Sequence, residues 1–138
     1  MENSKFQFKG FKIIRSLIER NEKKLSPEVS LSFTPKGIIN KKDSVFKLQL
    51  GVKIEDKNKS FNIEIKAVAN YIFDRNENLE NLNKYFYINA PALLFPYIRA
   101  YISTLTNLSG FKPINLPTLN MTQLGDNLKK NTSEVDVL

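Results

Sequence analysis

The chain contains no cysteine, no histidine and no tryptophan among its 138 residues. Without cysteine and histidine it has no disulfides, thiol nucleophiles, zinc sites of the usual kind, serine–histidine–aspartate triads or imidazole proton shuttle. The five glycines are isolated from one another, so that no glycine-rich phosphate loop is present. We therefore expect no enzyme: no residue is a candidate for a catalytic, cofactor-binding or metal-binding role.

Long apolar runs are absent as well. The longest uncharged apolar stretch, residues 90–98, is much shorter than the roughly 20 residues that cross a bilayer. The first residues, MENSKFQFKGFK, interleave charge with apolar side chains and lack the apolar core of a signal peptide. The sequence predicts a cytoplasmic protein that does not insert into membranes.

What is present is a balanced composition with an excess of aromatic rings. Hydrophobic residues make up 41% and charged residues 25% of the chain, which also holds 10 Phe and 5 Tyr. This composition predicts one globular domain, residues 1–138, with a hydrophobic core of its own. Part of the ring surface exceeds what a small core requires.

The net charge of +7 is unevenly distributed. Residues 1–70 hold 15 Lys and Arg against 8 Asp and Glu, whereas residues 71–138 hold 6 of each. Such a basic half is typical of nucleic-acid binding, but only 4 of the 21 cations are Arg, the usual reader of bases and phosphates. Lysines on the solvent face of a sheet are the simpler explanation.

Strict alternation of apolar and polar residues predicts three strands. They cover residues 28–34 (EVSLSFT), 45–55 (VFKLQLGVKIE) and 61–73 (FNIEIKAVANYIF). The sequence TPKG, residues 34–37, predicts a turn, and DKNKS, residues 56–60, a hairpin loop.

The first segment, residues 5–20, is open to two interpretations. Its alternation at Phe6 and Phe8 changes register near Gly10, which favours a strand with a bulge at that glycine. The competing interpretation is a helix over residues 11–20, because Phe11, Ile14 and Ile18 share one helical stripe. Four consecutive strands predict an antiparallel meander over residues 1–73, with one apolar face that needs a cover.

Residues 74–131 predict the helical part of an α+β domain, with two helices on one face of the sheet. A loop with a short helix covers residues 74–86, and a long helix is expected to begin at the cap Asn89 and to end at Gly110. Pro96 is expected to kink this helix or to lie near its true start. Residues 111–120 form an extended connector, residues 121–131 a second helix, and residues 132–138 a loose tail.

The long helix is apolar on more than one side, so that it needs more than one partner. One side can cover the sheet, and the other is explained by a second subunit or by an apolar client in a groove. A structural domain whose own side chains fill that groove is the further alternative.

The stretch APALLFPYIRAYISTLTNLSGFKPINLPTLNMTQL, residues 90–124, resembles the SecB family of protein-export chaperones. The family's Pro–x–x–Leu–Phe–Pro–Tyr–x–Arg element, followed by Gly and by Asn-Leu-x-Pro, is matched here by Pro91, Leu94, Phe95, Pro96, Tyr97, Arg99, Gly110, Asn115 and Leu116. Pro27, Glu28 and Val29 match the Pro-Glu-Val that opens the family's second strand.

This resemblance implies a SecB-like fold, a homotetramer built as a dimer of dimers, and an ATP-independent holdase. Such a holdase binds unfolded, secretion-bound chains in apolar grooves and passes them to the SecA motor. The acidic sheet face and the tail through which the family docks SecA are not matched here. An antitoxin client, or a nucleic acid bound by the basic half, are the alternatives.

The resemblance also implies which residues carry these roles. The client groove is expected to use Leu25, Pro27, Val29, Leu31, Leu116, Leu119, Met121 and Leu124. The interface between dimers is expected to use Tyr97, Ile98, Tyr101, Ile102 and Leu105.

Overall fold

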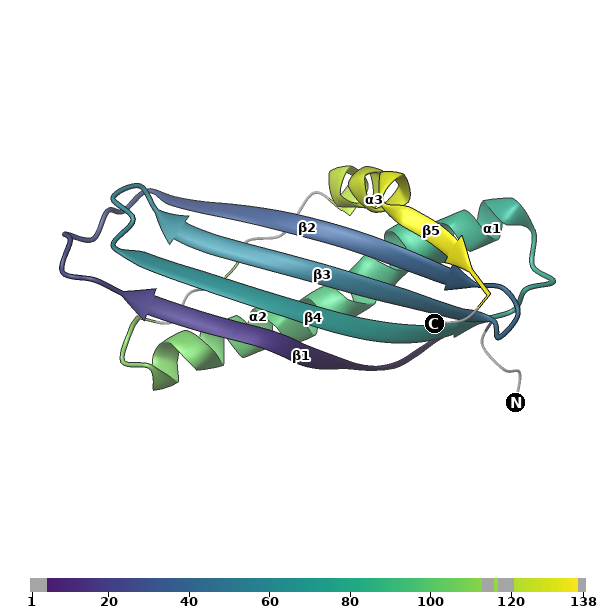
Figure 1. Ribbon diagram of the computed structural model, residues 1–138, viewed down its shortest axis with the longest axis horizontal. Helices are drawn as coiled ribbons and strands as arrows, with labels where there is room; N and C mark the ends of the chain where they lie inside the picture. Colours follow the sequence, from purple (N-terminus) through teal and green to yellow (C-terminus); the bar gives the residue numbers. More distant parts are fainter. Residues whose placement is uncertain (1–4, 113–115, 117–120, 137–138) are drawn as a thin grey trace.

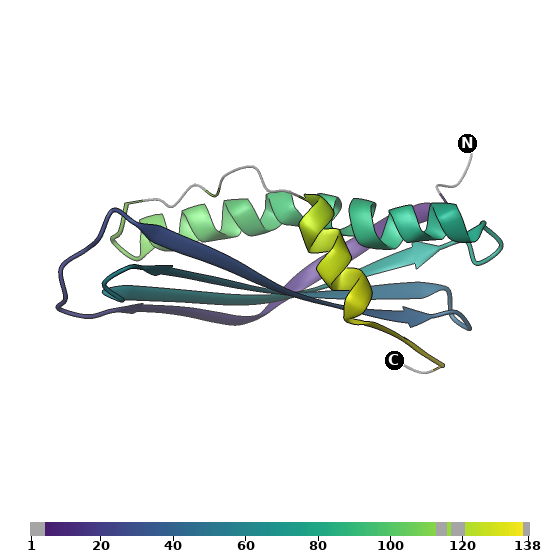
Figure 2. The ribbon, with the colours of Figure 1, turned by 90° about the horizontal axis from the view of Figure 1, so that it is seen from above.

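The computed structural model describes residues 5–112, 116 and 121–136 of the chain. A sheet of strand order β1-β4-β3-β2-β5 forms one layer, and α2 crosses behind it (Figure 1). Seen from above, α1 and α2 lie on one side of the twisted sheet, whereas α3 runs from that side past the strands towards β5 (Figure 2). The elements are β1 Phe6–Arg20, β2 Val29–Asn40, β3 Val45–Asp56, β4 Phe61–Phe73, α1 Leu79–Lys84, η1 Tyr85–Asn89, α2 Ala90–Leu108, α3 Met121–Lys130 and β5 Thr132–Val135.

The predicted α+β class is confirmed, and so are the strands over residues 45–55 and 61–73. β3 and β4 lie at the centre of the sheet and pair antiparallel, with Leu48 opposite Ala69 and Leu50 opposite Ala67. Their inward side chains are almost completely buried, because every second residue points to the face that the helices cover.

The first segment is a strand along its whole length, so that the helical alternative for residues 11–20 is wrong. β1 pairs antiparallel with β4, and its register shifts between Phe8 and Phe11, as the sequence predicted. Gly10 has a φ of 109° at this bulge, a conformation that residues with a side chain rarely adopt. A second shift lies between Ile13 and Arg15.

The turn predicted at residues 34–37 is wrong, because β2 continues through it to Asn40. Pro35 lies opposite Leu50 of β3. The N–H of Gly37, two residues on, donates to the Asn131 carbonyl on the far side of β2 from β3 (3.2 Å). In a strand, the backbone nitrogens of residues two apart point to the same side. The nitrogen of Pro35 therefore also faces away from β3, and its missing N–H removes no hydrogen bond between β2 and β3.

The sheet has five strands and is mixed, whereas four antiparallel strands were predicted. Residues 132–135, expected in a loose tail, form β5 and pair parallel with Gly37–Asn40 of β2. The Asn40 side chain also donates to the Asp136 carbonyl (3.2 Å). The segment TSEV is too short and too polar for alternation to indicate a strand. Its pairing with β2 depends on the position at which α3 ends.

The helical part is continuous from Leu79 to Leu108, because α1, η1 and α2 follow one another directly. Its N-cap is Asn78, whose side chain accepts the N–H of Asn81 (2.8 Å). Asn89 has helical dihedral angles and makes no capping bond, so that the predicted cap is wrong. Pro96 lies inside α2 and not at its start. No helix in the described ranges is both long enough and apolar enough to span a bilayer.

The helix α2 is anchored to the centre of the sheet. The buried Tyr71 hydroxyl of β4 donates to the Ala90 carbonyl at the first residue of α2 (2.6 Å). Burial of this phenol raises its pKa, so that the hydroxyl stays protonated and remains a donor. Around it Phe6 stacks on Tyr71 at 5.1 Å between ring centroids, and Phe46 on Phe86 at 4.6 Å.

The second helix, predicted over residues 121–131, is confirmed as α3, which leads into β5. Gly125 packs directly against η1: a Cβ at this position would collide with the backbone carbonyl oxygen of Tyr87. A backbone oxygen cannot move aside as the end of a flexible side chain can. The close approach therefore requires glycine in the middle of a helix, where glycine otherwise lowers stability.

We expect Gly125→Ala to lower the free energy of unfolding, measured by urea titration with circular dichroism, by up to about 2 kcal/mol. Overpacking costs about 1–3 kcal/mol, and alanine recovers about 1 kcal/mol of helix propensity. Asp126→Ala, at the exposed neighbouring position, is the matched control and should be neutral or stabilising. A Gly125→Ala protein as stable as this control would contradict the close approach.

Candidate functional site

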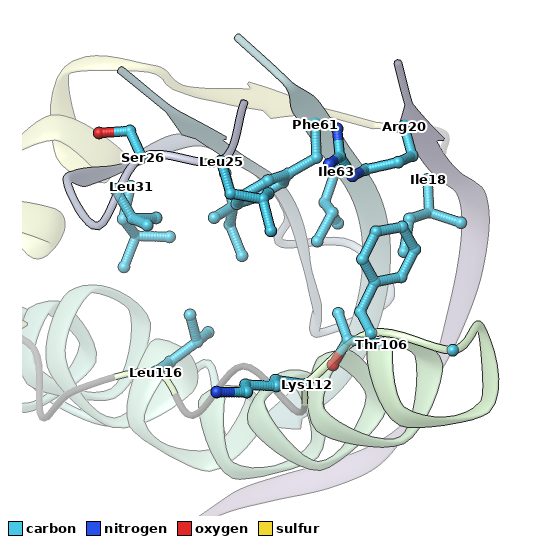
Figure 3. A pocket seen from close by; sticks show the side chains of 14 residues that line it. Ile18, Arg20, Leu25, Ser26, Leu31, Phe61, Ile63, Thr106, Lys112 and Leu116 are labelled. Atoms are coloured by element: carbon cyan, nitrogen blue, oxygen red, sulfur yellow. The ribbon is translucent and has the colours of Figure 1, made fainter. Parts of the chain in front are cut away.

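An open apolar groove of ≈ 960 Å³ lies at one end of the molecule. It is enclosed between the sheet and the C-terminal end of α2 (Figure 3). The sheet contributes Ile18, Val29, Leu31, Ile54, Phe61 and Ile63. The opposite wall is made by Thr106, Gly110, Phe111, Lys112 and Leu116, and the rim by Arg20, Leu25 and Ser26.

The groove exists because the strands extend beyond the part of the sheet that helices cover. Leu25 and Val29 are each 51% exposed, although contact of a leucine or valine side chain with water is energetically unfavourable. Across from Leu25 and Leu31, Figure 3 shows Leu116 and Lys112 on the other wall, with an open space between them. None of the side chains that the structure describes fills this space.

The rim segment that carries Leu25 and Ser26 is held by a buried carboxylate at the end of β3. Asp56 accepts the N–H of Ser26 (3.0 Å), the N–H of Ser60 (2.6 Å) and the Ser60 hydroxyl. Burial favours a raised pKa for this carboxyl, but the bonds from Ser60, Ser26 and Phe61 outweigh burial and lower the pKa from 3.8 to about 2. Asp56 is therefore ionised at neutral pH and fixes the rim.

Arg20 holds the same rim from the end of β1. One guanidinium nitrogen donates to the carbonyls of Lys23 and Ser60, each at 3.1 Å, and to that of Asn21. These bonds connect the segment after β1 to the hairpin between β3 and β4. The rim is thus a polar network around an apolar opening.

Four of the eight predicted groove residues line the groove: Leu25, Val29, Leu31 and Leu116. Pro27 is exposed beside it but is not part of its lining. Leu124 is buried in the core, because it lies on the side of α3 that faces the sheet and η1. Leu119 and the side chain of Met121 lie outside the described residues.

Sequence reasoning missed the groove residues that come from β1, β4 and the end of α2. Ile18, Phe61 and Ile63 continue the apolar face of the sheet, and their alternation does not distinguish a covered stretch from an uncovered one. Phe111, directly after Gly110, was assigned only to the connector. The apolar positions of the sheet that the helix leaves uncovered become apparent only from the structure, in which α2 ends at Leu108.

The predicted interface residues of α2 divide between two environments. Ile98 and Ile102 have no exposed surface and belong to the protein's own core. Leu105 is partly buried against that core, and the Tyr101 hydroxyl bonds the Ser16 hydroxyl (2.7 Å). Tyr97 is 48% exposed, and two further apolar residues of α2 are exposed with it: Leu93 and Leu108.

Six of the 13 lysines in the basic half lie in β1 to β4, and the other seven lie before β1 or in the segments that connect the strands. In the strand register Lys36 is opposite Gln49, and Lys47 is opposite Asn70. Within the described strands the aromatic residues alternate to the inner face, which leaves the outer face without a ring for base stacking. This arrangement fits the simpler explanation of the lysines, solvation of a sheet face.

Comparisons with known proteins agree with this architecture. A solved structure of the Mycobacterium tuberculosis SecB-like chaperone Rv1957, in complex with a ChAD peptide from the Rv1956 HigA1 antitoxin, has a TM-score of 0.69 to this chain. It is 21% identical, and the match covers 84% of this chain and 88% of that one. The likeness shows a shared α+β fold: a sheet covered on one face by a long helix.

The family is shown by the sequence comparisons. A family model described as "Preprotein translocase subunit SecB" matches residues 14–131, and the chain belongs to this SecB family. The Protein-export protein SecB of Roseobacter denitrificans is 29% identical over 98 residues, 70% of this chain and 58% of that protein. That of Paraburkholderia phymatum is 36% identical over 87 residues, 59% and 54% of the two chains. The chain thus spans little more than half the length of these relatives.

We expect Asp56 to make the stability of the protein depend on acid pH. Its folded-state pKa of about 2 lies below the ordinary 3.8, so its contribution is complete above about pH 4 and is lost as the pH falls towards 2. Asp56→Asn should lower the urea midpoint at pH 7 and flatten its decline between pH 4 and pH 2. The exposed Asp126→Asn is the control, and an equally steep decline in the two variants would contradict the role of Asp56.

Proposed function

We propose that this protein is an ATP-independent holdase that binds unfolded polypeptides in its apolar groove. The observation that carries the proposal is the open groove of ≈ 960 Å³ with half-exposed Leu25 and Val29 at its entrance. Membership of the SecB family supports it. Delivery of secretion-bound clients to the SecA motor is the finer part of the proposal, and it rests on the family resemblance alone.

The groove suits clients of many sequences. Burial of apolar surface contributes about 25 cal/mol per Å² whatever the order of the side chains. Ordering an extended chain opposes binding, so that a long contact surface is required. A polar group at the rim, such as the partly exposed Ser26 hydroxyl, can bond the client's backbone without selecting its side chains.

A homotetramer is part of the proposal. Leu93, Tyr97 and Leu108 share one stripe along α2, and each is at least 42% exposed, although the Tyr97 ring also packs on Phe8 and Phe11 of β1. Exposed apolar residues at this spacing along one helix form a stripe that a neighbouring subunit can cover. By the family resemblance, this stripe would lie between two dimers.

A dedicated antitoxin client is the second candidate. The observation that favours it is the complex of the Mycobacterium tuberculosis chaperone of the same fold with an antitoxin peptide. The same groove would then hold one particular apolar segment instead of many.

We expect the purified protein to bind an unfolded secretory precursor with submicromolar affinity, measured by calorimetry together with light scattering of the complex. Leu25→Asn should weaken binding about five-fold, because a half-exposed leucine buried by a client contributes about 1 kcal/mol. Leu79→Asn is the matched control, since Leu79 is 71% exposed on α1, far from the groove.

Three outcomes would change the conclusion. Equal weakening by the two variants would mean that the groove is not the client site. Affinity for nucleic acid that falls steeply with salt, without client binding, would favour the basic half as the binding surface. Binding of one antitoxin and of no general precursor would favour the dedicated client.

We expect light scattering to give the mass of a tetramer, and Leu93→Arg to reduce this mass to that of a dimer. A charge placed in an apolar interface is buried without a partner, which disfavours association. Leu79→Arg adds the same charge on α1 and should leave the tetramer intact. A wild-type monomer, or a Leu93→Arg tetramer, would contradict the interface.

A further inference from the structure

The groove is apolar, but its charged groups are all of one sign. Of the described residues that line it, only Arg20 and Lys112 carry charge, and none is Asp or Glu. They come from opposite walls, Arg20 from the end of β1 and Lys112 from the segment after α2 (Figure 3). A client segment in the groove therefore passes between two cations.

Arg20 is a fixed cation. Its bonds to the carbonyls of Lys23 and Ser60 hold the guanidinium in place without neutralising it. Among the described residues, no carboxylate lies within ion-pair distance of it, whereas Arg15 on the same strand pairs with Glu64 at 3.1 Å. Its positive charge is thus available to a bound segment.

Lys112 is exposed and forms no ion pair within the described part of the chain. Figure 3 shows its ammonium between Leu116 and Thr106, on the side of the open space. An anionic group that enters beside Leu116 comes within reach of this ammonium.

The loops around the groove add further positive charge to that of Arg20 and Lys112. The segment before β2 and the hairpin before β4 hold four lysines and two glutamates: Lys23, Lys24, Lys57, Lys59, Glu22 and Glu28. One of the glutamates, Glu28, already pairs with Lys57 at 3.7 Å. The carboxylate of Asp56 is buried and is committed to Ser26 and Ser60, and Glu19 lies on β1 beside a separate depression.

We infer that the groove selects apolar client segments that carry Asp or Glu, and that Lys112 and Arg20 are the specificity-determining residues. The inference rests on the proposed function and names its client class. A carboxylate next to the apolar residues gains charge-assisted hydrogen bonds, which are stronger than neutral ones. A lysine or arginine at the same place meets two like charges in an environment that screens them less than water does.

The test uses three peptides with one apolar core of Leu and Phe, flanked on each side by two Asp, two Asn or two Lys. Acetylated and amidated ends remove terminal charge, and fluorescence anisotropy measures binding to the full chain. We expect the acidic peptide to bind about ten-fold more tightly than the basic one, the effect of two exposed ion pairs. The ratio should fall when salt shortens the Debye length.

Lys112→Gln should reduce this ratio about three-fold, because the acidic peptide loses one ion pair and the basic peptide loses one repulsion. Lys66→Gln is the matched control, because it removes one charge from an exposed position of β4 and does not touch the groove. The ratio should stay at the wild-type value in this control. Lys112→Glu should abolish the preference between the acidic and the basic peptide, because the new negative charge offsets the charge of Arg20.

The outcomes separate the two proposals. Binding of all three peptides with equal affinity would overturn the charge selection and leave the holdase standing. Equal loss of the ratio in Lys112→Gln and Lys66→Gln would overturn the role of the groove cations, since net charge alone would then explain it. Failure of all three peptides to bind would overturn the proposed function itself.

Discussion

The architecture depends on one constraint: a single run of helix must cover the apolar face of a twisted sheet. The 30 continuous residues Leu79–Leu108 extend over about 45 Å, nearly the roughly 50 Å of β1. However, α2 crosses the strands obliquely, so that its C-terminal end lies by β1 and away from β2 (Figure 1). The Tyr71 bond to Ala90 fixes α2 near one end of the strands, where the aromatic side chains of Phe6, Phe46 and Phe86 complete the cover. The apolar face near Leu25, Val29 and Leu31 then stays uncovered, and the groove is a consequence of this oblique crossing.

Polar residues decide the form of the uncovered end. An apolar surface without a rim would collapse or associate with others of its kind. Here the Asp56 carboxylate and the Arg20 guanidinium bond to backbone groups of the segments around the opening. Each is buried or anchored through several bonds, so that the position of the rim is set by hydrogen bonds and not by contact with the apolar wall. The groove can thus remain open while its edges stay ordered.

The sequence predicted well what depends on local periodicity. The alternation in β3 and β4 is confirmed, because one face of these strands is buried and the other is not. The bulge at Gly10 is confirmed as well, because the alternation changes register there. It predicted poorly what depends on distant partners. The turn at Pro35 is absent because β2 pairs with β3 along its whole length, and the cap at Asn89 is absent because a π-helical turn carries the helix through it.

The same division applies to the site. Leu25, Val29 and Leu31 could be placed in the groove through a family motif and an alternating pattern. Leu124 could not be separated from the core, because the side of α3 that meets η1 is set by Gly125 and its contact with Tyr87. Ile98 and Tyr97 are adjacent in an apolar helix, and only the direction of the sheet decides that one is buried and the other exposed.

The fifth strand has a consequence for the order of folding. Its pairing with β2 joins groups 96 positions apart in the chain, as the bond between Asn40 and Asp136 shows. Loop closure of this size is slow compared with the hairpin between β3 and β4, and a parallel pair cannot form from a tight turn. During synthesis on the ribosome, residues 37–40 therefore present an unpaired strand edge until residues 132–135 emerge. In this interval the nascent domain carries an aggregation-prone edge.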